Sequence, residues 1–297
     1  MDERLPTISV ITPSYNQARF VRLTLESVLG QDYPKEKVQY IVMDGASTDG
    51  SADIIREYAG DLAYFQSERD GGQSNAINMG FARADGDIVA WLNSDDVYLP
   101  GVFRSVARAL EDPTVGATTG EAFHWDTERR GLYRTANTRA SRPMLKWYGN
   151  VVAQPTCFWR REVFRNEPPL NPNYHRILDY DLHLRLTGRG VRYVHTAQPR
   201  VVIIWHGDNK CAVDGGREEI RELERIHGIW PMGLRETAGK ALFAATLVRE
   251  GKGDVVRQIL AHRVRHRGDG TLLGVPVPPP EAEEILGTDL HQKLLPL

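Results

Sequence analysis

The chain contains 297 residues, with 37 Lys and Arg against 39 Asp and Glu, a formal net charge of −2. Hydrophobic residues make up 41% and charged residues 26%, a balance typical of folded water-soluble proteins that excludes disordered, collagen-like and membrane-spanning chains. This near-neutral charge also argues against nucleic acid as a partner. The acidic start lacks the basic and apolar segments of a secretory signal, and Cys157 and Cys211 form no Cys-x-x-Cys pair, so we expect a cytoplasmic protein.

Apolar runs and amphipathic stretches alternate through the first third of the chain. Strands are predicted at residues 7–12, 38–44, 63–67 and 88–92, and helices at 19–29, 51–58, 74–84 and 101–110. Strands separated by helices of this length predict βαβ units, and therefore an α/β fold with a mainly parallel sheet. Ligands of such sheets bind at the carboxyl ends of the strands, so the residues that follow each strand are the first candidates for a site.

The pattern becomes irregular at residues 116–173, where aromatic residues are scattered among polar ones. We interpret this part as a substrate-binding region, with core packing an equally good alternative for any single ring. The pattern at residues 178–186 then predicts a helix. The pattern at 191–205 predicts two short strands about Pro199. Helical patterns follow at 217–227, 239–249 and 255–266, and four prolines between Pro276 and Pro280 predict an extended tail.

Each of the first four predicted strands ends in a cluster of polar residues. The clusters begin at Tyr15, Asp44, Glu68 and Asn93. Adjacent carboxylates in such clusters repel one another unless a cation neutralises them, and Mg²⁺ and Mn²⁺ prefer oxygen ligands of this kind. A helix N-cap explains an isolated acidic pair equally well, but four clusters at neighbouring strand ends favour a divalent metal site.

Three of these segments, in this order, resemble the motifs of a known family. Residues 8–16 read Ile-Ser-Val-Ile-Thr-Pro-Ser-Tyr-Asn, residues 43–50 read Met-Asp-Gly-Ala-Ser-Thr-Asp-Gly, and residues 91–96 read Trp-Leu-Asn-Ser-Asp-Asp. With them the chain is similar to the family 2 glycosyltransferases, inverting enzymes with the glycosyltransferase A fold, over roughly residues 5–210. The resemblance implies a Rossmann-like sheet flanked by helices.

The resemblance also implies a division of the chain into domains. Residues 1–210 would form the catalytic domain, with a nucleotide-sugar-binding half at 1–115 and an acceptor half at 116–210. Residues 211–297 would form a helical C-terminal extension with a Pro-rich tail.

By this resemblance, the donor nucleoside binds at the first three strand ends. Pro13 and Tyr15 would line the base pocket, and Asp44 would accept a hydrogen bond from a base imide nitrogen. Asp70 would lie on the nucleoside side, where Gly71 lets the backbone approach the ligand closely.

The fourth strand end would hold the ribose and the diphosphate. Asn93, Ser94 and Asp95 would bind the donor, and Asn93 stands where the family often has a third Asp. Asp95 and Asp96 resemble the paired acidic motif of the family and would bind Mn²⁺ or Mg²⁺. His206, which follows the last predicted strand, would be a further metal ligand.

An inverting transfer needs a carboxylate that takes the proton of the acceptor hydroxyl. Asp179 falls on the position of this base in the family, with Asp181 in reserve, and Leu178 replaces a Glu that the family usually has. The implied reaction moves a sugar from a nucleotide sugar to a saccharide acceptor, on a lipid carrier in bacterial surface polysaccharide assembly. A UDP-sugar is the favoured donor, and GDP and dTDP sugars stay open.

Two other functions are weighed against this one. The departures at Asn93 and Leu178 leave room for an inactive nucleotide-sugar-binding or assembly subunit. A sugar nucleotidyltransferase is disfavoured because residues 12–16 contain no Gly-rich phosphate loop.

The C-terminal extension carries one further pattern. Residues 255–267 form a basic amphipathic segment that could rest on the inner face of the cell membrane, although packing on the catalytic domain is the favoured alternative.

Overall fold

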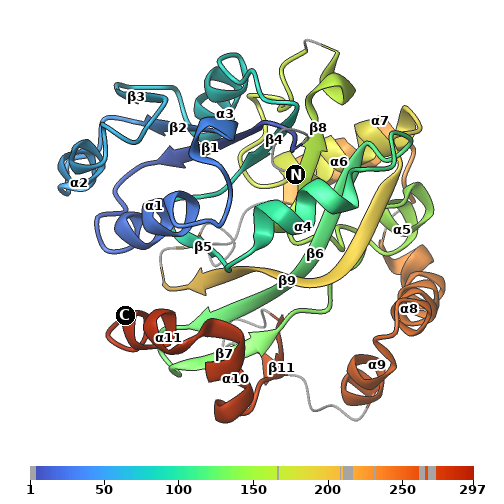
Figure 1. The fold of residues 1–297 in the computed structure, drawn as a ribbon. Helices are drawn as coiled ribbons and strands as arrows, with labels where there is room; N and C mark the ends of the chain where they lie inside the picture. Colours follow the sequence, from blue (N-terminus) through green and yellow to red (C-terminus); the bar gives the residue numbers. More distant parts are fainter. Residues whose placement is uncertain are drawn as a thin grey trace.

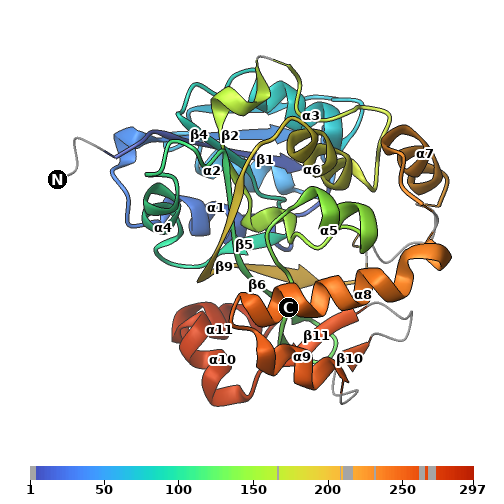
Figure 2. The same cartoon turned by 90° about the vertical axis from the view of Figure 1, so that its right-hand side faces the viewer.

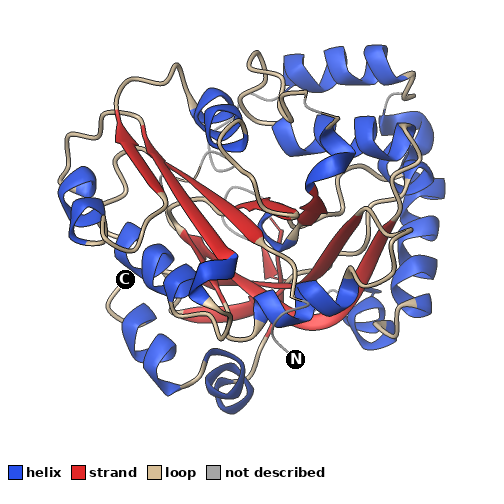
Figure 3. Ribbon diagram, turned by 45° about the horizontal axis from the view of Figure 1, so that its top comes forward, coloured by secondary structure: helices blue, strands red, loops and turns tan. Residues whose placement is uncertain are grey.

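The computed structural model describes residues 5–165, 167–207, 209, 217–230, 232–260, 265–266 and 272–297. A large mixed sheet runs through the middle of the molecule, and helices flank it (Figure 1; Figure 3). Its strands follow the order β10-β11-β7-β6-β8-β4-β1-β2-β3, and β9 joins this path at β6 and also pairs with β5. The candidate site lies where the parallel strands of this sheet end.

The parallel part of the sheet comes from the first third of the chain. It contains β1 (Ile8–Ser14), β2 (Val38–Asp44), β3 (Tyr64–Ser67) and β4 (Ile88–Trp91), which pair in the order β4-β1-β2-β3. The helices between and after them are α1 (Val21–Leu29), α2 (Ser51–Glu57), α3 (Gln73–Phe81) and α4 (Val102–Ala109), with a short 3₁₀ turn, η2 (Lys35–Lys37), before β2. The predicted alternation of four strands and four helices is confirmed. β1 is buried along its whole length, which accounts for its almost unbroken apolar run.

The next part of the chain shows no regular sequence pattern, yet it contains several helices and strands. Residues 116–173 contain β6 (Ala117–Asp126), β7 (Gly131–Arg134), α5 (Arg142–Trp147), η3 (Gln154–Thr156), β8 (Phe158–Arg160) and η4 (Arg161–Phe164). β6 buries Thr118, Thr119 and Glu121 among its apolar residues, so its sequence shows no regular alternation. Most aromatic rings of this segment belong to the core, including Trp125 and Trp159, whereas Trp147 is exposed.

Two strands beside the parallel part also differ from expectation. β9 (Tyr193–Trp205) is one long strand, parallel to β6, instead of two short ones about Pro199. An irregularity in the β6·β9 register beside Pro199 accommodates that proline. β5 (Asp96–Tyr98) was not predicted, and it pairs antiparallel with β9. The helix predicted at 178–186 is confirmed as α6 (Leu178–Gly188).

The C-terminal segment folds against the sheet and adds strands to it. It contains α7 (Arg217–His227), α8 (Met232–Arg249), α9 (Gly253–Leu260), β10 (Arg265–His266), β11 (Leu272–Pro276), α10 (Pro279–Leu286) and α11 (Thr288–Leu294). Figure 2 shows α8 to α11 on the side of β6 and β9, away from α2 and α3. β11 pairs with β7 and so extends the sheet.

Two expectations for this segment are wrong. The helix predicted to reach residue 266 ends at Leu260, and residues 265–266 are a strand. The predicted extended tail instead forms α10 and α11, because proline is tolerated in the first turn of a helix and α10 begins at Pro279. The residues 261–264 of the predicted helix lie outside the described part of the chain.

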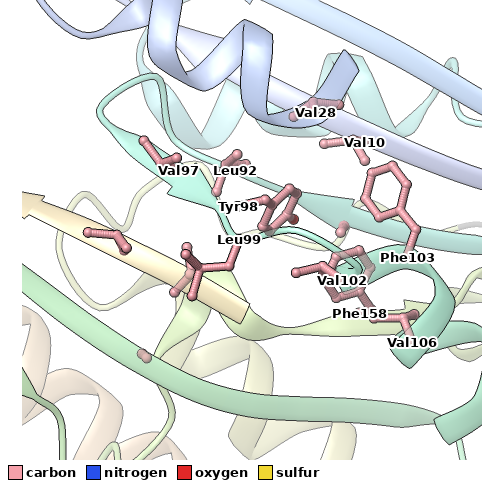
Figure 4. Packing of buried hydrophobic residues seen from close by; sticks show 14 of the residues in the cluster. Val10, Val28, Leu92, Val97, Tyr98, Leu99, Val102, Phe103, Val106 and Phe158 are labelled. Carbon is pink, nitrogen blue, oxygen red and sulfur yellow. The ribbon is translucent and has the colours of Figure 1, made fainter. Parts of the chain in front are cut away.

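Two apolar cores cover the two faces of the sheet. Val10 and Ile11, adjacent on β1, point to opposite cores, as neighbouring strand residues must. Figure 4 shows the first core, in which Tyr98, Phe103 and Phe158 pack below Val10. The second core includes Val255 and Val256 of α9, which favours packing over membrane contact for this helix. Within the described residues, no helix combines the length and the apolar character needed to span a bilayer.

Candidate functional site

A cleft of about 1880 Å³ lies along the carboxyl ends of β1 to β4 and continues to the start of α6. Most of the predicted site residues line it: Pro13, Tyr15, Asp70, Gly71, Asn93, Ser94, Asp95, Asp96 and Asp179. Three predicted residues, Asp44, Asp181 and His206, are not in its lining. The fold thus brings residues from both halves of the predicted catalytic domain to one cavity.

At one end of the cleft, an aromatic ring and a carboxylate lie close to one glycine. The ring of Tyr15 is 61% exposed, and a Cβ on Gly45 would lie 3.3 Å from it and 3.0 Å from Asp70 Oδ2. Gly71 and Gly72, with φ of +75° and +111°, adopt backbone conformations that favour glycine, and Asp70 Oδ1 accepts the N–H of Gly72 at 2.7 Å. An exposed ring beside a free carboxylate oxygen suits a planar polar ligand.

Asp44 lies behind this end of the cleft. The predicted role of its carboxylate is to accept a hydrogen bond from the nucleobase of the donor. Its carboxylate is 2% exposed and accepts hydrogen bonds from the Ser47 N–H at 2.9 Å, Ser47 Oγ at 2.5 Å and Ser67 Oγ at 2.6 Å. These bonds shape the loop that carries Gly45 and Ala46 into the cleft lining. The geometry gives Asp44 a role in holding the loop, and the contact of its carboxylate with a base stays a prediction.

The acidic pair occupies the middle of the cleft, where β4 leads into β5. Asp96 is 3% exposed, and its Oδ2 accepts a hydrogen bond from Asn93 Nδ2 at 3.3 Å. Asn93 Oδ1 in turn accepts one from Gln73 Nε2 at 2.8 Å, so Asn93 is held between α3 and the acidic pair. Burial, and then the charge of Asp95, raises the pKa of Asp96 well above its usual range.

Asp95 contacts a histidine that lies 111 residues later in the chain. Asp95 Oδ2 lies 3.2 Å from His206 Nε2, and the imidazole stacks on Phe20 with a centroid distance of 4.4 Å. Asn209 Oδ1 accepts the N–H of His206 at 2.5 Å, and Asn209 Nδ2 donates to Asp95 Oδ2 at 3.3 Å. The structure thus brings the acidic motif and His206 together through Asp95, with Asn209 as a support.

These donors fit a divalent cation only in part. Asp95 supplies a carboxylate and His206 supplies an imidazole, which suit Mn²⁺ and Mg²⁺. Asp96 is engaged by Asn93, and the described residues contain no group of three His, Cys, Asp or Glu side chains arranged to hold a metal. The charge of Asp95 adds to burial in raising the pKa of Asp96, and a cation beside the pair would offset this repulsion. Asp95 and His206 are thus in contact, and Asp96, the third predicted metal ligand, directly follows Asp95 in the chain.

Asp179 lies in the first turn of α6, at the other end of the cleft. Its Oδ1 accepts the N–H of Tyr180 at 2.8 Å, and its Oδ2 accepts Asn150 Nδ2 at 2.8 Å. Burial raises the pKa of Asp179, against the opposing effect of the hydrogen bond from Asn150. A carboxylate with a raised pKa that faces a cleft is suited to accept a proton.

Asp181 points away from the cleft and is 5% exposed. Its carboxylate pairs with Arg185 Nε at 2.7 Å and with His227 Nε2 at 3.2 Å. Burial disfavours its charge, but the hydrogen bonds from His227 and Arg185 outweigh burial and lower the pKa of Asp181. Asp181 thus links α6 to α7, and it lies outside the cleft lining to which Asp179 belongs.

The cleft wall beside Asp179 is held from α7. The carboxylate of Glu219 accepts the backbone N–H groups of His175 at 3.2 Å, Arg176 at 3.0 Å and Ile177 at 3.4 Å. These three residues line the cleft directly before α6 begins. A charged residue of the C-terminal segment therefore fixes the backbone at the start of the helix that carries Asp179.

Several polar residues of the site were not predicted from the sequence. They are Gln73, Asn150, Gln154, Asn209 and Glu219. Asn209 could have been found, because it lies three residues after His206. The others lie in segments with no motif, and their partners are distant in sequence.

The sequence matches the family profile described as glycosyl transferase family 2 over residues 9–167, more than half of the chain. An uncharacterized glycosyltransferase of Nostoc sp. is 35% identical over 184 residues, which cover 57% of this chain and 56% of that protein. The hyaluronan synthase of Streptococcus pyogenes is 28% identical over 172 residues, which cover 52% of this chain and 41% of that protein. The chain spans about half, or less, of the length of the curated relatives that it matches.

Solved structures show the same fold at low sequence identity. S. aureus TarS 1–349 in complex with UDP-GlcNAc superposes with a TM-score of 0.62 at 19% identity, over 81% of this chain and 71% of that chain. A mannosyltransferase from Pyrobaculum calidifontis in complex with GDP-Man and Mn²⁺ has a TM-score of 0.54 at 19% identity, over 98% of this chain and 85% of that chain.

Proposed function

The chain belongs to glycosyltransferase family 2 and has the glycosyltransferase A fold, and from this premise we propose that it is an inverting glycosyltransferase. It would move a sugar from a nucleoside diphosphate sugar, with a UDP-sugar favoured, to a hydroxyl of a saccharide acceptor. One observation carries the proposal: a single cleft is lined at its centre by Asp95, which contacts His206, and at one end by Asp179.

The donor nucleoside would bind at Tyr15, Gly45 and Asp70. The exposed ring of Tyr15 offers a stacking surface, and the lack of a side chain on Gly45 leaves space next to Asp70. Two proteins of the same fold carry nucleotide sugars in their structures, UDP-GlcNAc in one and GDP-Man in the other, which supports a donor of this class.

The diphosphate of the donor would lie next to Asp95 and His206, which would hold Mn²⁺ or Mg²⁺. When bound, such a cation supplies positive charge that neutralises the leaving diphosphate. Asp96 would be a further ligand of the cation, whose positive charge would favour the ionised carboxylate that burial and Asp95 disfavour.

Asp179 would act as the general base. Its carboxylate takes the proton of an acceptor hydroxyl while the hydroxyl oxygen forms a bond to the anomeric carbon and the bond from that carbon to the diphosphate oxygen breaks. Attack from the side opposite to the leaving group inverts the anomeric centre. We propose an oligosaccharide on a lipid carrier as acceptor. The similarity to hyaluronan synthase supports a role in bacterial polysaccharide or glycan assembly.

The test is binding followed by turnover. Thermal stability is measured with UDP, GDP and dTDP, each with and without Mn²⁺, because a ligand of the native state raises its stability. We expect one nucleotide to stabilise the protein more strongly with Mn²⁺, and the matching nucleotide sugar to be consumed when saccharide acceptors are added.

Each other outcome supports a different function. Stabilisation by a nucleotide sugar without transfer to any acceptor would indicate a binding or assembly subunit. Formation of a nucleotide sugar from a nucleoside triphosphate and a sugar phosphate would indicate a nucleotidyltransferase. No stabilisation at millimolar nucleotide would contradict the donor site.

A further inference from the structure

We propose that Asn150 is a positioning residue for Asp179, whose amide holds the carboxylate in the orientation and the charge state that proton removal from the acceptor needs. The inference rests on the proposed function, since it takes Asp179 as the base. Asn150 lies in the loop after α5, and no motif marks it in the sequence. Both residues line the cleft.

The orientation of the Asn150 amide follows from its two partners. Nδ2 lies 2.8 Å from Asp179 Oδ2, and Oδ1 lies 3.3 Å from the backbone N–H of Val152. In the flipped orientation, the amide oxygen would face a carboxylate oxygen and the NH₂ group would face an N–H. The local turn to Val152 therefore directs the donor side of Asn150 toward Asp179.

The carboxylate of Asp179 is held at both oxygens. Oδ1 accepts the N–H of Tyr180 at 2.8 Å, and Oδ2 accepts Asn150. The first contact comes from the backbone of α6 itself, so Asn150 is the side chain that prevents rotation of the carboxylate. Each oxygen retains a lone pair, which leaves room for an acceptor hydroxyl in the cleft.

Asn150 also stabilises the negative charge of Asp179, together with the backbone N–H of Tyr180. Within the described part of the chain, no ion pair involves Asp179. The buried thiol of Cys157 interacts electrostatically with Asp179 but stays neutral, because burial raises its pKa well above the usual range. His175 and Arg176 line the same cleft, and their backbones are held by Glu219. The amide of Asn150 lowers the pKa of Asp179 against the effect of burial.

The test uses Asn150→Asp, which keeps the size of the side chain and the oxygen that accepts from Val152. The variant replaces only the donor that faces Asp179, and it does so with a second carboxylate. The chain offers a matched control in Asn171→Asp: Asn171 Oδ1 accepts the N–H of Asn173, also two residues on, at 3.0 Å, and Asn171 does not line the cleft.

We expect the acid limb of the kcat profile to move to higher pH by about one unit or more in Asn150→Asp, because like charges in contact raise a carboxyl pKa. At pH values below both limbs, a shift of one unit lowers kcat roughly tenfold, and KM for the donor is unchanged. Asn150→Ala, which loses both bonds, moves the limb in the same direction and also lowers the plateau. Asn171→Asp keeps the wild-type profile.

A loss of kcat that is equal at every pH in Asn150→Asp and Asn150→Ala would overturn the inference, since it would reflect folding alone. A ¹³C carboxyl titration of Asp179 in the same variants gives the pKa without turnover. An unchanged Asp179 titration in Asn150→Asp contradicts the inference even where no sugar is transferred. Absence of transfer by the wild type with every donor and acceptor, together with a shifted Asp179 titration, contradicts the proposed function instead.

Discussion

Asp179 and Asp181 lie two positions apart on α6, and their neighbours give them different chemistry. Asp179 faces the cleft with a neutral amide as its side-chain partner, whereas Asp181 pairs with the Arg185 guanidinium and contacts the His227 imidazole. The pKa of the first is raised and that of the second is lowered. Two carboxyl groups with pKa values shifted in opposite directions are typical of one reactive and one structural residue.

The first residue-scale prediction compares these two carboxylates. Asp179→Asn should lower kcat by about 10²- to 10⁴-fold, the usual contribution of a general base, and leave donor binding unchanged. Asp181→Asn is the matched control, two residues away, and should keep most of the activity. Initial rates and nucleotide titrations of both variants provide the measurement, and near-normal turnover of Asp179→Asn would exclude it as the base.

The second residue-scale prediction concerns stability. Asp181→Asn should lower the free energy of unfolding by about 1–3 kcal/mol at neutral pH, because it removes one member of a buried charge network. The pKa of Asp181 is lowered in the folded state, so its contribution is present above the unfolded pKa and disappears as pH falls through the folded pKa. Urea unfolding of both proteins should show a difference that shrinks below about pH 4. A difference that is constant with pH would assign the loss to packing.

At the scale of elements, α7 determines how α6 presents Asp179. The Glu219 carboxylate accepts hydrogen bonds from three backbone N–H groups just before α6. His227 contacts Asp181 on α6 itself. The helix has no side-chain cap at its own N-cap, Ile177. A carboxylate from α7 therefore does what an N-cap residue would do, and it joins the C-terminal segment to the site.

The element-scale prediction is that Glu219→Ala lowers kcat about tenfold, because the start of α6 loses its anchor and Asp179 loses its alignment. Glu218→Ala, an exposed neighbour on the same helix, should have wild-type activity. Hydrogen exchange should be faster at the amides of residues 175–177 in Glu219→Ala only. Unchanged protection of these amides would show that α6 does not depend on α7.

At the scale of the whole molecule, one lysine connects the C-terminal segment to the sheet. Lys252, between α8 and α9, is 9% exposed, and its Nζ lies 2.7 Å from Glu121 Oε1 on β6 and 2.9 Å from His195 Nε2 on β9. It also donates to the backbone oxygen of Asn137, a residue of the cleft lining. The segment after residue 211 is thus bound to the sheet by a buried ion pair as well as by the pairing of β11 with β7.

The whole-molecule prediction is that Lys252→Met lowers the free energy of unfolding by about 3 kcal/mol, because it leaves the Glu121 carboxylate buried without its cation. Glu121→Gln in the Lys252→Met background should restore a large part of the loss. Lys35→Met should have little effect, since Lys35 is exposed and lies 3.8 Å from Asp61. Urea midpoints of the four proteins test this, and the absence of rescue by Glu121→Gln would show that lost packing, not the buried charge, destabilises Lys252→Met.

The sequence by itself determined the parallel half of the sheet and nine of the residues that line the cleft. Apolar runs, helix periodicity and turn residues depend on neighbours along the chain, so β1 to β4 and α1 to α4 could be predicted. Residues that follow parallel strands meet at one edge, which is why Tyr15, Asp70 and Asp95 were found without the structure.

Only the tertiary structure decided the rest, because the partners come from distant parts of the chain. β6 carries polar residues among apolar ones because they have partners on β9: Arg200 Nη2 donates to Thr118 Oγ1 at 2.9 Å. Asp95 and His206 are separated by 111 residues in the chain. The surroundings of Asp179 are set by Asn150 and, through the backbone before α6, by Glu219 of α7. Periodicity along the chain determines which residues follow the end of each strand. Burial and charge pairing between distant segments determine the pKa of each of these residues.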